Sequence, residues 1–396
     1  MNIFFLTYAH ERGIRMQTGG IRKVRELGNA LAKMGHRPAI FLPGDEYIPE
    51  NDPARHEPYP VIRLPVLRPL SAYLAQFVMP LWFSRRSGGF RPDVVYFRTA
   101  PTVLPLLLSR LMKARFVIEI NGDILGEERG KRARLWRDTL HYFRMRLTLT
   151  SERINCRGAN AVVTLTEGLK RTVTGRYGIP GEKVFVIESG TNADHCRPLD
   201  PGECRRKFGM DPDQPCVTFI GVLYKHQGID SLIDAAPLIL EKYPETLFLI
   251  GGDGPTKNAW IEKAEAAGLS GAFRFMGVIP YERLPEFINT ATVCAAPFSG
   301  NRGEASPLKV FDYMACGKPV VASDIPSLRP LIGKSGGILP VKPDDPRELA
   351  SALIGLLGNE GERSRMGRNG RKYIEAHHRW DIIAGETVRA LQAGAG

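Results

Sequence analysis

The chain has 396 residues, of which 43% are hydrophobic and 24% charged. This balance is usual for a folded globular protein and excludes a disordered or collagen-like chain. At about 150 residues per domain, the length predicts two or three domains. The formal net charge of +12 is unevenly placed: residues 1–190 hold 30 Lys and Arg against 17 Asp and Glu, a net +13, and the remainder is −1. We expect the first half to meet something acidic, such as an anionic membrane, a phosphorylated acceptor or nucleic acid.

The six cysteines are too few and too scattered for a disulfide framework, and none forms a C-x-x-C pair. We interpret them as reduced thiols of a cytosolic protein. Residues 1–13 lack the basic start of a signal peptide, and their apolar run stops at His10. No segment has the roughly 20 apolar residues that span a bilayer. We expect a cytoplasmic protein that lies, at most, on the inner face of the plasma membrane.

Two segments of the first half have the composition of a membrane-surface contact. Residues 129–157 carry nine basic side chains among apolar and aromatic ones. This mixture is typical of a basic amphipathic helix at an anionic interface, and the alternative is a solvated helix whose arginine stems cover the core. Residues 66–90 are apolar, aromatic-rich and interrupted by prolines, which a buried helix explains equally well.

Short apolar runs alternate with helical periodicity along the whole chain. Residues 2–8 indicate a strand, apolar positions three or four apart predict a helix from Ile21 to Met34, and a second strand follows at residues 39–42. Further strands are expected at 94–97, 116–120, 161–165 and 184–187. After a polar stretch at 189–215, strands expected at 217–220, 246–250, 273–276, 293–296, 319–322 and 338–341 alternate with helices at 229–243, 258–268, 281–291, 307–316 and 346–357.

This alternation predicts an α/β protein with parallel, doubly wound sheets, each covered by helices on both faces. Two such runs with a linker between them predict two Rossmann-like domains. Ligands of open parallel sheets bind beyond the carboxyl ends of the strands. The interdomain cleft is therefore the expected ligand site.

Three glycine-bearing segments stand out, one before the first expected helix and two at the carboxyl ends of expected strands. Gly19 and Gly20 precede a helix, and further glycines lie in the segments 221–228 and 251–255. Two glycines before a helix let its N-terminus approach an anion closely, although such a pair is more often a simple turn. None of the three segments is a complete dinucleotide fingerprint or a P-loop.

The segment 302–319 is the most informative of the chain. Ser306 is expected to cap a helix that begins at Pro307, and this helix is apolar nearly all round, which predicts its burial. Lys309 and Asp312 lie three positions apart on one of its faces, and Glu304 precedes the cap. Because buried charges are costly unless paired, we consider two interpretations. Lys309 and Asp312 form an internal ion pair, or the helix N-terminus and Lys309 hold a diphosphate while the carboxylates hold hydroxyl groups.

Taken in order, these motifs resemble the family-4 retaining glycosyltransferases of the GT-B fold, over nearly the whole chain. The resemblance implies an acceptor-binding domain at 1–190, a nucleotide-sugar-binding domain at 191–378, and a C-terminal helix at 379–396 that packs back on the first domain. The segments that carry it are the Gly-Gly loop, residues 162–198, the G-x-L…Q-G loop at 221–228, the Gly-Asp-Gly-Pro turn, residues 275–280, and the paired acids Glu304 and Asp312 with seven residues between them.

The resemblance also implies roles for particular residues. Glu304 would contact hydroxyl groups of the donor sugar and Asp312 the nucleotide ribose, while residues 276–279, with Val278 and Ile279, would face the base. Such enzymes need no metal and no resident cofactor, because fixed dipoles and cations neutralise the leaving diphosphate, and the D-x-D sequence at 211–213 is expected to be a turn. The catalytic residues that it implies are Glu304, Lys309 and Asn121, and the donor-binding residues are Gly19, Gly20, Lys225, Gly254, Val278, Ile279, Ser306, Pro307, Leu308 and Asp312.

The chain departs from the family at several of these positions. Val222 and Gln227 stand where the family has Arg and Lys in the loop after the first strand of the second domain. Lys225 is expected to supply the missing cation, with help from Lys309. Asp312 replaces a glutamate. Asn121 replaces a histidine, which keeps a hydrogen-bonding group but removes a proton shuttle.

We therefore expect a metal-independent retaining glycosyltransferase with a nucleotide-sugar donor and a lipid-linked or glycan acceptor. It would act beside an anionic membrane, in bacterial surface polysaccharide or glycolipid biosynthesis, and bind no nucleic acid. One alternative, a GT-B sugar-nucleotide epimerase, needs an acid/base pair near the sugar C2, for which the sequence shows no constellation. The other, a non-enzymatic protein that binds anionic polymers, explains the charge but not Glu304, Lys309 and Asp312 in the neutral half.

Overall fold

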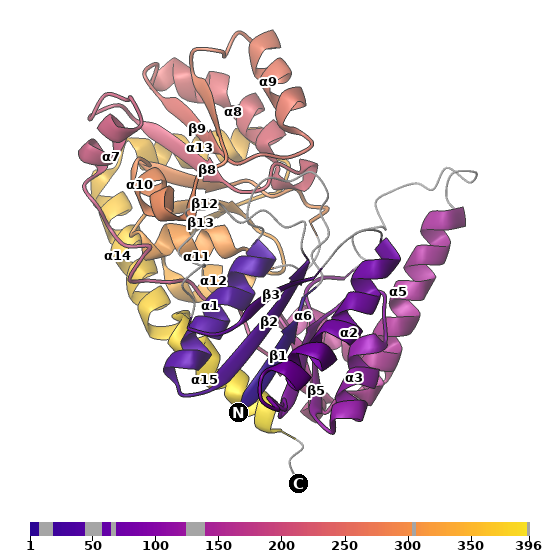
Figure 1. Ribbon diagram of the computed structural model, residues 1–396. Coiled ribbons are helices and arrows are strands. Elements are labelled where there is room, and N and C mark those ends of the chain that lie inside the picture. Colours follow the sequence, from indigo (N-terminus) through magenta and orange to yellow (C-terminus); the bar gives the residue numbers. More distant parts are fainter. Residues whose placement is uncertain (8–18, 44–57, 65–68, 124–138, 303–305, 394–396) are drawn as a thin grey trace.

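The computed structural model describes residues 1–7, 19–43, 58–64, 69–123, 139–302 and 306–393. Two parallel sheets organise these residues into an N-terminal domain, below in Figure 1, and a C-terminal domain above it. The expectation of two doubly wound, Rossmann-like domains is confirmed.

The first sheet has the strand order β3-β2-β1-β4-β5-β6-β7, with every pairing parallel. Its strands are β1 Asn2–Leu6, β2 Arg37–Pro43, β3 Val61–Leu64, β4 Val94–Arg98, β5 Arg115–Ile120, β6 Ala161–Thr164 and β7 Val184–Val186. Most of their apolar residues are fully buried, because helices cover both faces. Strand β3 was not predicted.

Two hydrophobic layers sandwich this sheet. One layer joins it to α1 and to the C-terminal helix α15, through residues such as Val24, Leu27 and Ile383. The opposite layer joins it to the remaining helices of the domain. The helices are α1 Gly19–Lys33, α2 Pro69–Arg86, α3 Leu104–Met112, α5 Thr139–Gly158, α6 Glu167–Tyr177 and α15 Trp380–Gln392.

The second sheet has the order β10-β9-β8-β11-β12-β13, again entirely parallel. Helices α8, α9 and α13 share one hydrophobic layer with it, and α10, α11, α12 and α14 share the other. Its strands are β8 Cys216–Ile220, β9 Leu247–Gly251, β10 Phe273–Gly277, β11 Val293–Ala296, β12 Val320–Ser323 and β13 Ile338–Val341. Its helices are α7 Pro201–Lys207, α8 Ile229–Lys242, α9 Lys257–Ala266, α10 Leu284–Asn289, α11 Leu308–Ala315, α12 Arg329–Ser335, α13 Pro346–Leu357 and α14 Glu360–His377.

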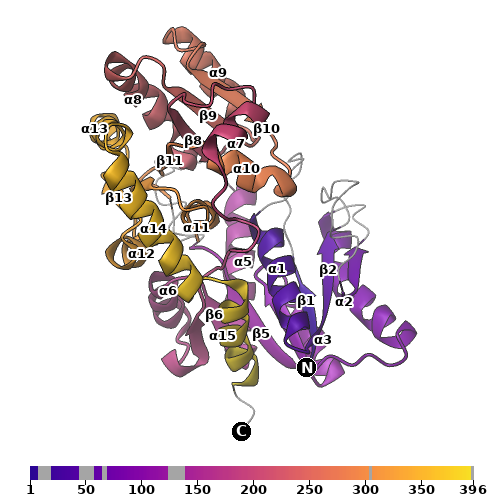
Figure 2. The ribbon, with the colours of Figure 1, turned by 90° about the vertical axis from the view of Figure 1, so that its left-hand side faces the viewer.

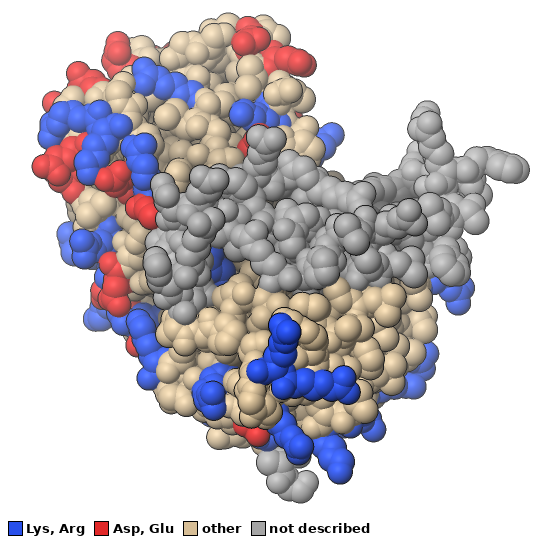
Figure 3. Space-filling view, in the orientation of Figure 1, with Lys and Arg blue, Asp and Glu red and all other residues tan. Residues whose placement is uncertain are grey.

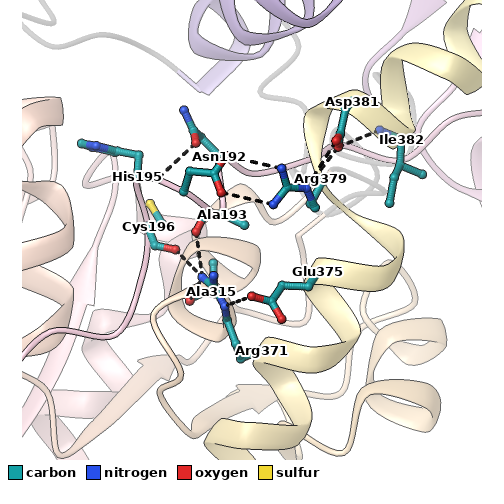
Figure 4. Close-up of polar contacts among 11 residues, drawn as sticks. Asn192, Ala193, His195, Cys196, Ala315, Arg371, Glu375, Arg379, Asp381 and Ile382 are labelled. Atoms are coloured by element: carbon teal, nitrogen blue, oxygen red, sulfur yellow. Dashed lines mark hydrogen bonds and ion pairs between the residues drawn. The ribbon is translucent and has the colours of Figure 1, made fainter.

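The chain passes between the domains twice, and the two passages lie side by side. The first runs through Thr191, and the second leads from α14 into α15, which packs against α1 and β6 below (Figure 2). The Thr191 amide donates a hydrogen bond to the carbonyl of His378 at 2.8 Å. Arg371 on α14 donates to the carbonyls of Ala193, Cys196 and Ala315, which ties the first passage to the end of α11 (Figure 4). None of the helices within the described ranges is long and apolar enough to cross a bilayer.

Candidate functional site

Helix α11 begins one residue later than its sequence predicts. Pro307 has φ −88° and ψ 68°, which lies outside the helical region, so the first helical residue is Leu308. No side chain caps the helix, and the hydroxyl of Ser306 is buried without a hydrogen-bond partner in the described part of the chain. The predicted cap at Ser306 and helix start at Pro307 are therefore wrong.

The Lys309 side chain turns away from Asp312 and reaches the loop between β8 and α8. Its Nζ donates a hydrogen bond to Oε1 of Gln227 at 2.6 Å and lies 3.6 Å from the centroid of the Phe219 ring. Burial lowers the pKa of Lys309 well below its usual value, and the nearby Arg302 lowers it further. Among the described residues, no carboxylate forms an ion pair with it. The internal Lys309–Asp312 ion pair is thus wrong, and Lys309 occupies the neighbourhood of Gln227, where the family has its lysine.

Asp312 is buried and joins the two domains. Its Oδ1 accepts hydrogen bonds from Nη2 of Arg22 on α1, at 2.5 Å, and from the hydroxyl of Thr191, at 2.6 Å. Burial by itself would lower the pKa of the Arg22 guanidinium, but the Asp312 carboxylate keeps that pKa above its ordinary value. The expected contact with a ribose stays a prediction. The interdomain contact was not expected from the sequence.

A second contact between the domains joins Tyr281 to Arg22 and to Glu26, which lies one helical turn further along α1. The Arg22 guanidinium lies over the ring of Tyr281, 5.3 Å from its centroid, and the Tyr281 hydroxyl donates to Oε1 of Glu26 at 2.6 Å. The Tyr281 carbonyl contacts Nε2 of His195, at 2.8 Å. Sequence reasoning missed Arg22, Glu26 and Tyr281, although the i, i+4 spacing of the first two places them on one face of α1.

The N-terminus of α1 faces the N-terminus of α11. Gly19 and Gly20 lie in the first turn of α1 rather than before it. A Cβ atom on Gly19 would lie 2.8 Å from the side chain of Leu308, and one on Gly20 would lie 2.1 Å from the guanidinium of Arg98. A side chain at either position would force the Leu308 or the Arg98 side chain to move, so glycine lets these two neighbours approach α1 closely. The two helix N-termini, where backbone N–H groups favour anions, therefore meet at the domain junction.

Charged side chains gather under the start of α1, at the carboxyl ends of β4 and β5. Nε of Arg98 lies 3.3 Å from Oδ1 of Asn121 and 3.3 Å from Oε1 of Glu119. Glu119 also pairs with Nζ of Lys23 at 3.0 Å and accepts a hydrogen bond from the Tyr96 hydroxyl. Burial raises the pKa of Glu119, but Lys23 and Arg98 outweigh it and hold that pKa below its ordinary value. The cluster has two cations for one carboxylate, and Asn121 is fixed at its edge.

The two glycine loops of the C-terminal domain are held together by their backbones. The Leu223 amide donates to the Asp253 carbonyl at 2.9 Å. Gly254 contacts Leu223 so closely that a Cβ atom would lie 2.7 Å from its nitrogen. Gly228 is the N-cap residue directly before α8 and has φ 72°, a conformation that favours glycine. Lys225 is exposed in the same loop, and its role as a replacement cation stays a prediction.

The remaining predicted residues follow β10 or lie outside the described ranges. Val278 and Ile279 are half-buried directly after β10, and Ile279 packs against the core of the domain, so their contact with a base stays a prediction. Glu304 lies outside the described residues. The sequence at 211–213 forms a turn, as predicted, in which the Asp213 amide donates to the Asp211 side chain. The described residues contain no cluster of three or more His, Cys, Asp or Glu that could hold a metal ion.

Two family models match the chain, one over each domain. A glycosyl transferase 4-like domain matches residues 18–190, and a glycosyl transferases group 1 domain matches residues 202–373. Together they account for most of both domains. The chain belongs to the family-4 glycosyltransferases of the GT-B fold. The resemblance carried by the sequence motifs is thereby confirmed.

Individual relatives and solved structures agree with this family. A D-inositol 3-phosphate glycosyltransferase of Acidothermus cellulolyticus is 30% identical over 234 residues, which are 56% of this chain and 51% of that protein. The chain spans about half the length of the curated relatives that it matches. Sucrose-phosphate synthase of Thermosynechococcus elongatus has a TM-score of 0.77 at 21% identity, and Anabaena HepE, in complex with UDP, has 0.73 at 16%. Both structures cover 99% of this chain and are themselves covered over 100% of their length, so they share its fold.

Proposed function

We propose that the protein transfers a sugar from a nucleoside-diphosphate sugar to an acceptor hydroxyl and retains the configuration at the anomeric carbon. The observation that carries the proposal is the position of Lys309. It is a buried lysine without a carboxylate partner among the described residues, at the start of a helix whose N-terminus faces that of α1. A diphosphate would complete this charge arrangement. The fold similarity to HepE, whose structure holds UDP, supports a nucleotide-sugar donor.

In the proposed reaction, the bond between the anomeric carbon and the diphosphate oxygen breaks, and the diphosphate leaves with the electron pair. Lys309, the hydroxyl of Ser306 and the N-terminus of α11 stabilise its developing charge. The acceptor oxygen bonds to the anomeric carbon on the face that the diphosphate left, and its proton passes to a diphosphate oxygen. Arg98 holds the Asn121 side chain. Asn121 forms a hydrogen bond with a sugar hydroxyl but does not transfer a proton in the reaction.

The acceptor is proposed to be lipid-linked or a glycan, bound by the basic N-terminal domain. Its net charge of +13 over residues 1–190 supports an anionic acceptor or an anionic surface. The curated relative named for D-inositol 3-phosphate gives further support, because that compound carries a phosphate. The protein would act as a peripheral protein at a membrane.

The proposal is tested by thermal unfolding with a panel of nucleoside diphosphates and nucleotide sugars, followed by transfer assays with the donor that binds. A diphosphate at 100 times its Kd should stabilise the fold by about 2.7 kcal/mol. The anomeric configuration of the product, read by NMR, decides between retention and inversion. Glu304→Ala should abolish transfer and leave the melting temperature unchanged. If no diphosphate raises that temperature, or if the variant keeps normal turnover, the proposed site is refuted.

A further inference from the structure

Three helices of the N-terminal domain expose large apolar side chains on the same side of the sheet. Helices α2, α3 and α5 all pack on the hydrophobic layer opposite to α1 and α15. Figure 1 shows them together on the right of that domain. We call their outer side the α2–α3–α5 face. Its apolar side chains are between 46% and 62% exposed and comprise Leu74, Val78, Trp82, Leu107, Leu111, Leu147 and Ile154.

The exposed side chains follow helical spacing, so they form stripes rather than isolated residues. Leu74, Val78 and Trp82 lie four positions apart on α2, and Leu107 and Leu111 lie four apart on α3. Helices α2 and α3 pack against each other. Helix α5 reaches α3 where a Cβ atom on Gly158 would lie 2.8 Å from the Leu106 side chain. The stripes therefore belong to neighbouring helices of one surface.

The exposed charged side chains of these helices are basic. Neither α2 nor α3 contains an acidic residue, and the one acidic residue of α5, Glu152, is buried and accepts a hydrogen bond from the Tyr177 hydroxyl. Figure 3 agrees, because the lower right margin of the molecule shows blue atoms and no red ones. The exposed basic residues of the three helices and of the residue after α3 include Arg85, Arg86, Arg110, Lys113, Arg146 and Arg153.

We propose that the α2–α3–α5 face docks on an anionic lipid bilayer, with Trp82 and the leucines in the interface and the arginines at the phosphate groups. Trp side chains favour the interface, and arginine stems reach from an apolar surface to the headgroups. Trp82 and Arg86 already make this pairing, with the guanidinium carbon 5.1 Å from the ring centroid. The inference deepens the proposed function by naming the surface that brings the enzyme to a lipid-linked acceptor.

The charge pattern favours a bilayer over a second copy of the chain. A two-fold interface would place the same face against itself. It would then bring the basic residues of two copies together with no exposed acidic side chain of the three helices to pair with them, and like charges at an interface oppose association. An anionic bilayer instead offers an apolar layer and a negative surface to the same face.

The test is co-sedimentation of the whole protein with vesicles of phosphatidylglycerol and phosphatidylcholine, compared with phosphatidylcholine alone. Binding is expected with the anionic vesicles, weakening as salt rises. The double variant Trp82→Ser, Leu111→Ser should lower the partition coefficient about tenfold or more, because two large apolar side chains leave the interface. The matched control is Met34→Ser with Leu238→Ser, whose side chains are similarly exposed, at 45% and 41%, outside the face. It should bind as the unmodified protein does.

Two further measurements separate the electrostatic contribution to vesicle binding from the insertion of Trp82 into the interface. Arg85→Gln with Arg110→Gln should weaken binding about tenfold at low salt and little at high salt. The control Arg368→Gln with Lys372→Gln, exposed on α14, should have no such effect. Tryptophan emission should shift to the blue on vesicles, and Trp82→Phe should remove most of that shift.

The proposal is overturned by any of three results. The first is that the unmodified protein fails to sediment with anionic vesicles at low salt. The second is that the variants of the α2–α3–α5 face bind vesicles as well as their controls do. In the third, the face variants abolish self-association measured by sedimentation equilibrium and leave vesicle binding intact. These assays need no sugar donor. A negative result in them would therefore refute membrane docking and leave the transferase proposal intact. Normal vesicle binding without any sugar transfer would refute only the transferase proposal.

Discussion

Replacing Lys309 by methionine tests the proposed diphosphate site most directly. The substitution keeps the approximate length and apolar stem of the side chain but removes the ammonium that lies 2.6 Å from Gln227 and 3.6 Å from the Phe219 centroid. A hydrogen bond to a charged group contributes about 1.5–3 kcal/mol. Since 1.4 kcal/mol is a factor of ten, the variant should bind a nucleoside diphosphate about 10- to 150-fold more weakly, as measured by calorimetry.

The same calorimetric experiment also measures whether the protein takes up a proton when the diphosphate binds. Burial lowers the pKa of Lys309 well below 10.5 in the free protein, and a diphosphate beside the amine would raise it again. At a pH between these two values, binding should take up as much as about one proton, seen as a dependence of the heat on the ionisation enthalpy of the buffer. In Lys309→Met, this uptake should disappear.

The pH dependence of stability carries the opposite sign to that of an ion-paired lysine. The folded protein holds Lys309 at a pKa below the unfolded value of 10.5, so the unfolded chain binds more protons between the two values. Lys309 should therefore make the free energy of unfolding rise with pH across that window. Lys309→Met should flatten the rise.

Lys318 provides the control for these measurements. It is also a buried lysine of the C-terminal domain with a pKa lowered by burial, but its Nζ donates to the carbonyls of Asn289 and Ala291. Lys318→Met should change stability and leave diphosphate affinity and proton uptake unchanged. The reasoning fails if Lys309→Met binds the diphosphate within twofold of the unmodified protein, or if both variants lose the same affinity.

Three further substitutions examine the surroundings of the site. Arg22→Met leaves the buried Asp312 carboxylate without its cation and should lower the free energy of unfolding by about 3 kcal/mol in urea titrations, and a loss under 1 kcal/mol would argue against the interdomain ion pair. Ser306→Ala breaks no hydrogen bond within the described structure and should leave stability unchanged while weakening diphosphate binding about 2- to 10-fold; unchanged affinity in calorimetry would remove Ser306 from the site. Glu119→Gln leaves the buried Lys23 without its carboxylate partner and should destabilise the protein by about 3 kcal/mol at pH 7. Because the pKa of Glu119 is held low, the difference in free energy of unfolding between the unmodified protein and this variant should stay constant above about pH 4.5 and narrow as the pH falls through the folded pKa. A difference that widens in acid would contradict the ion pairing of Glu119 with Lys23 and Arg98.

The sequence predicted those parts of the fold that depend on local patterns. Parallel strands buried on both faces appear as continuous apolar runs, and amphipathic helices appear at their own spacing. Strand β3 escaped prediction because its four residues, Val61–Leu64, include Arg63 and form no such run. The start of α11 was placed one residue early because the preference of proline for a first helical turn was overridden by the backbone at Pro307.

The contacts of the site were less predictable, because they join residues far apart in the chain. Lys309 and Gln227 are 82 positions apart, and Arg22 and Asp312 are 290 apart. No local periodicity encodes such pairs. The sequence did indicate that a buried helix with charged residues needs partners, but which charges would pair across the junction depended on the packing of α1 against α11.

The position of α15 constrains how the molecule can be divided. This helix follows the C-terminal domain in the chain, yet Trp380, Ile383 and Leu391 belong to the hydrophobic layer beneath α1. A fragment that ended after β7 would expose that layer to water. A chimera that exchanges the C-terminal domain with that of another protein should therefore be spliced at two places, near Thr191 and near Arg379, where the two passages between the domains lie side by side. Transplanting everything after the first splice would also replace α15, and with it part of the hydrophobic layer of the recipient's N-terminal domain.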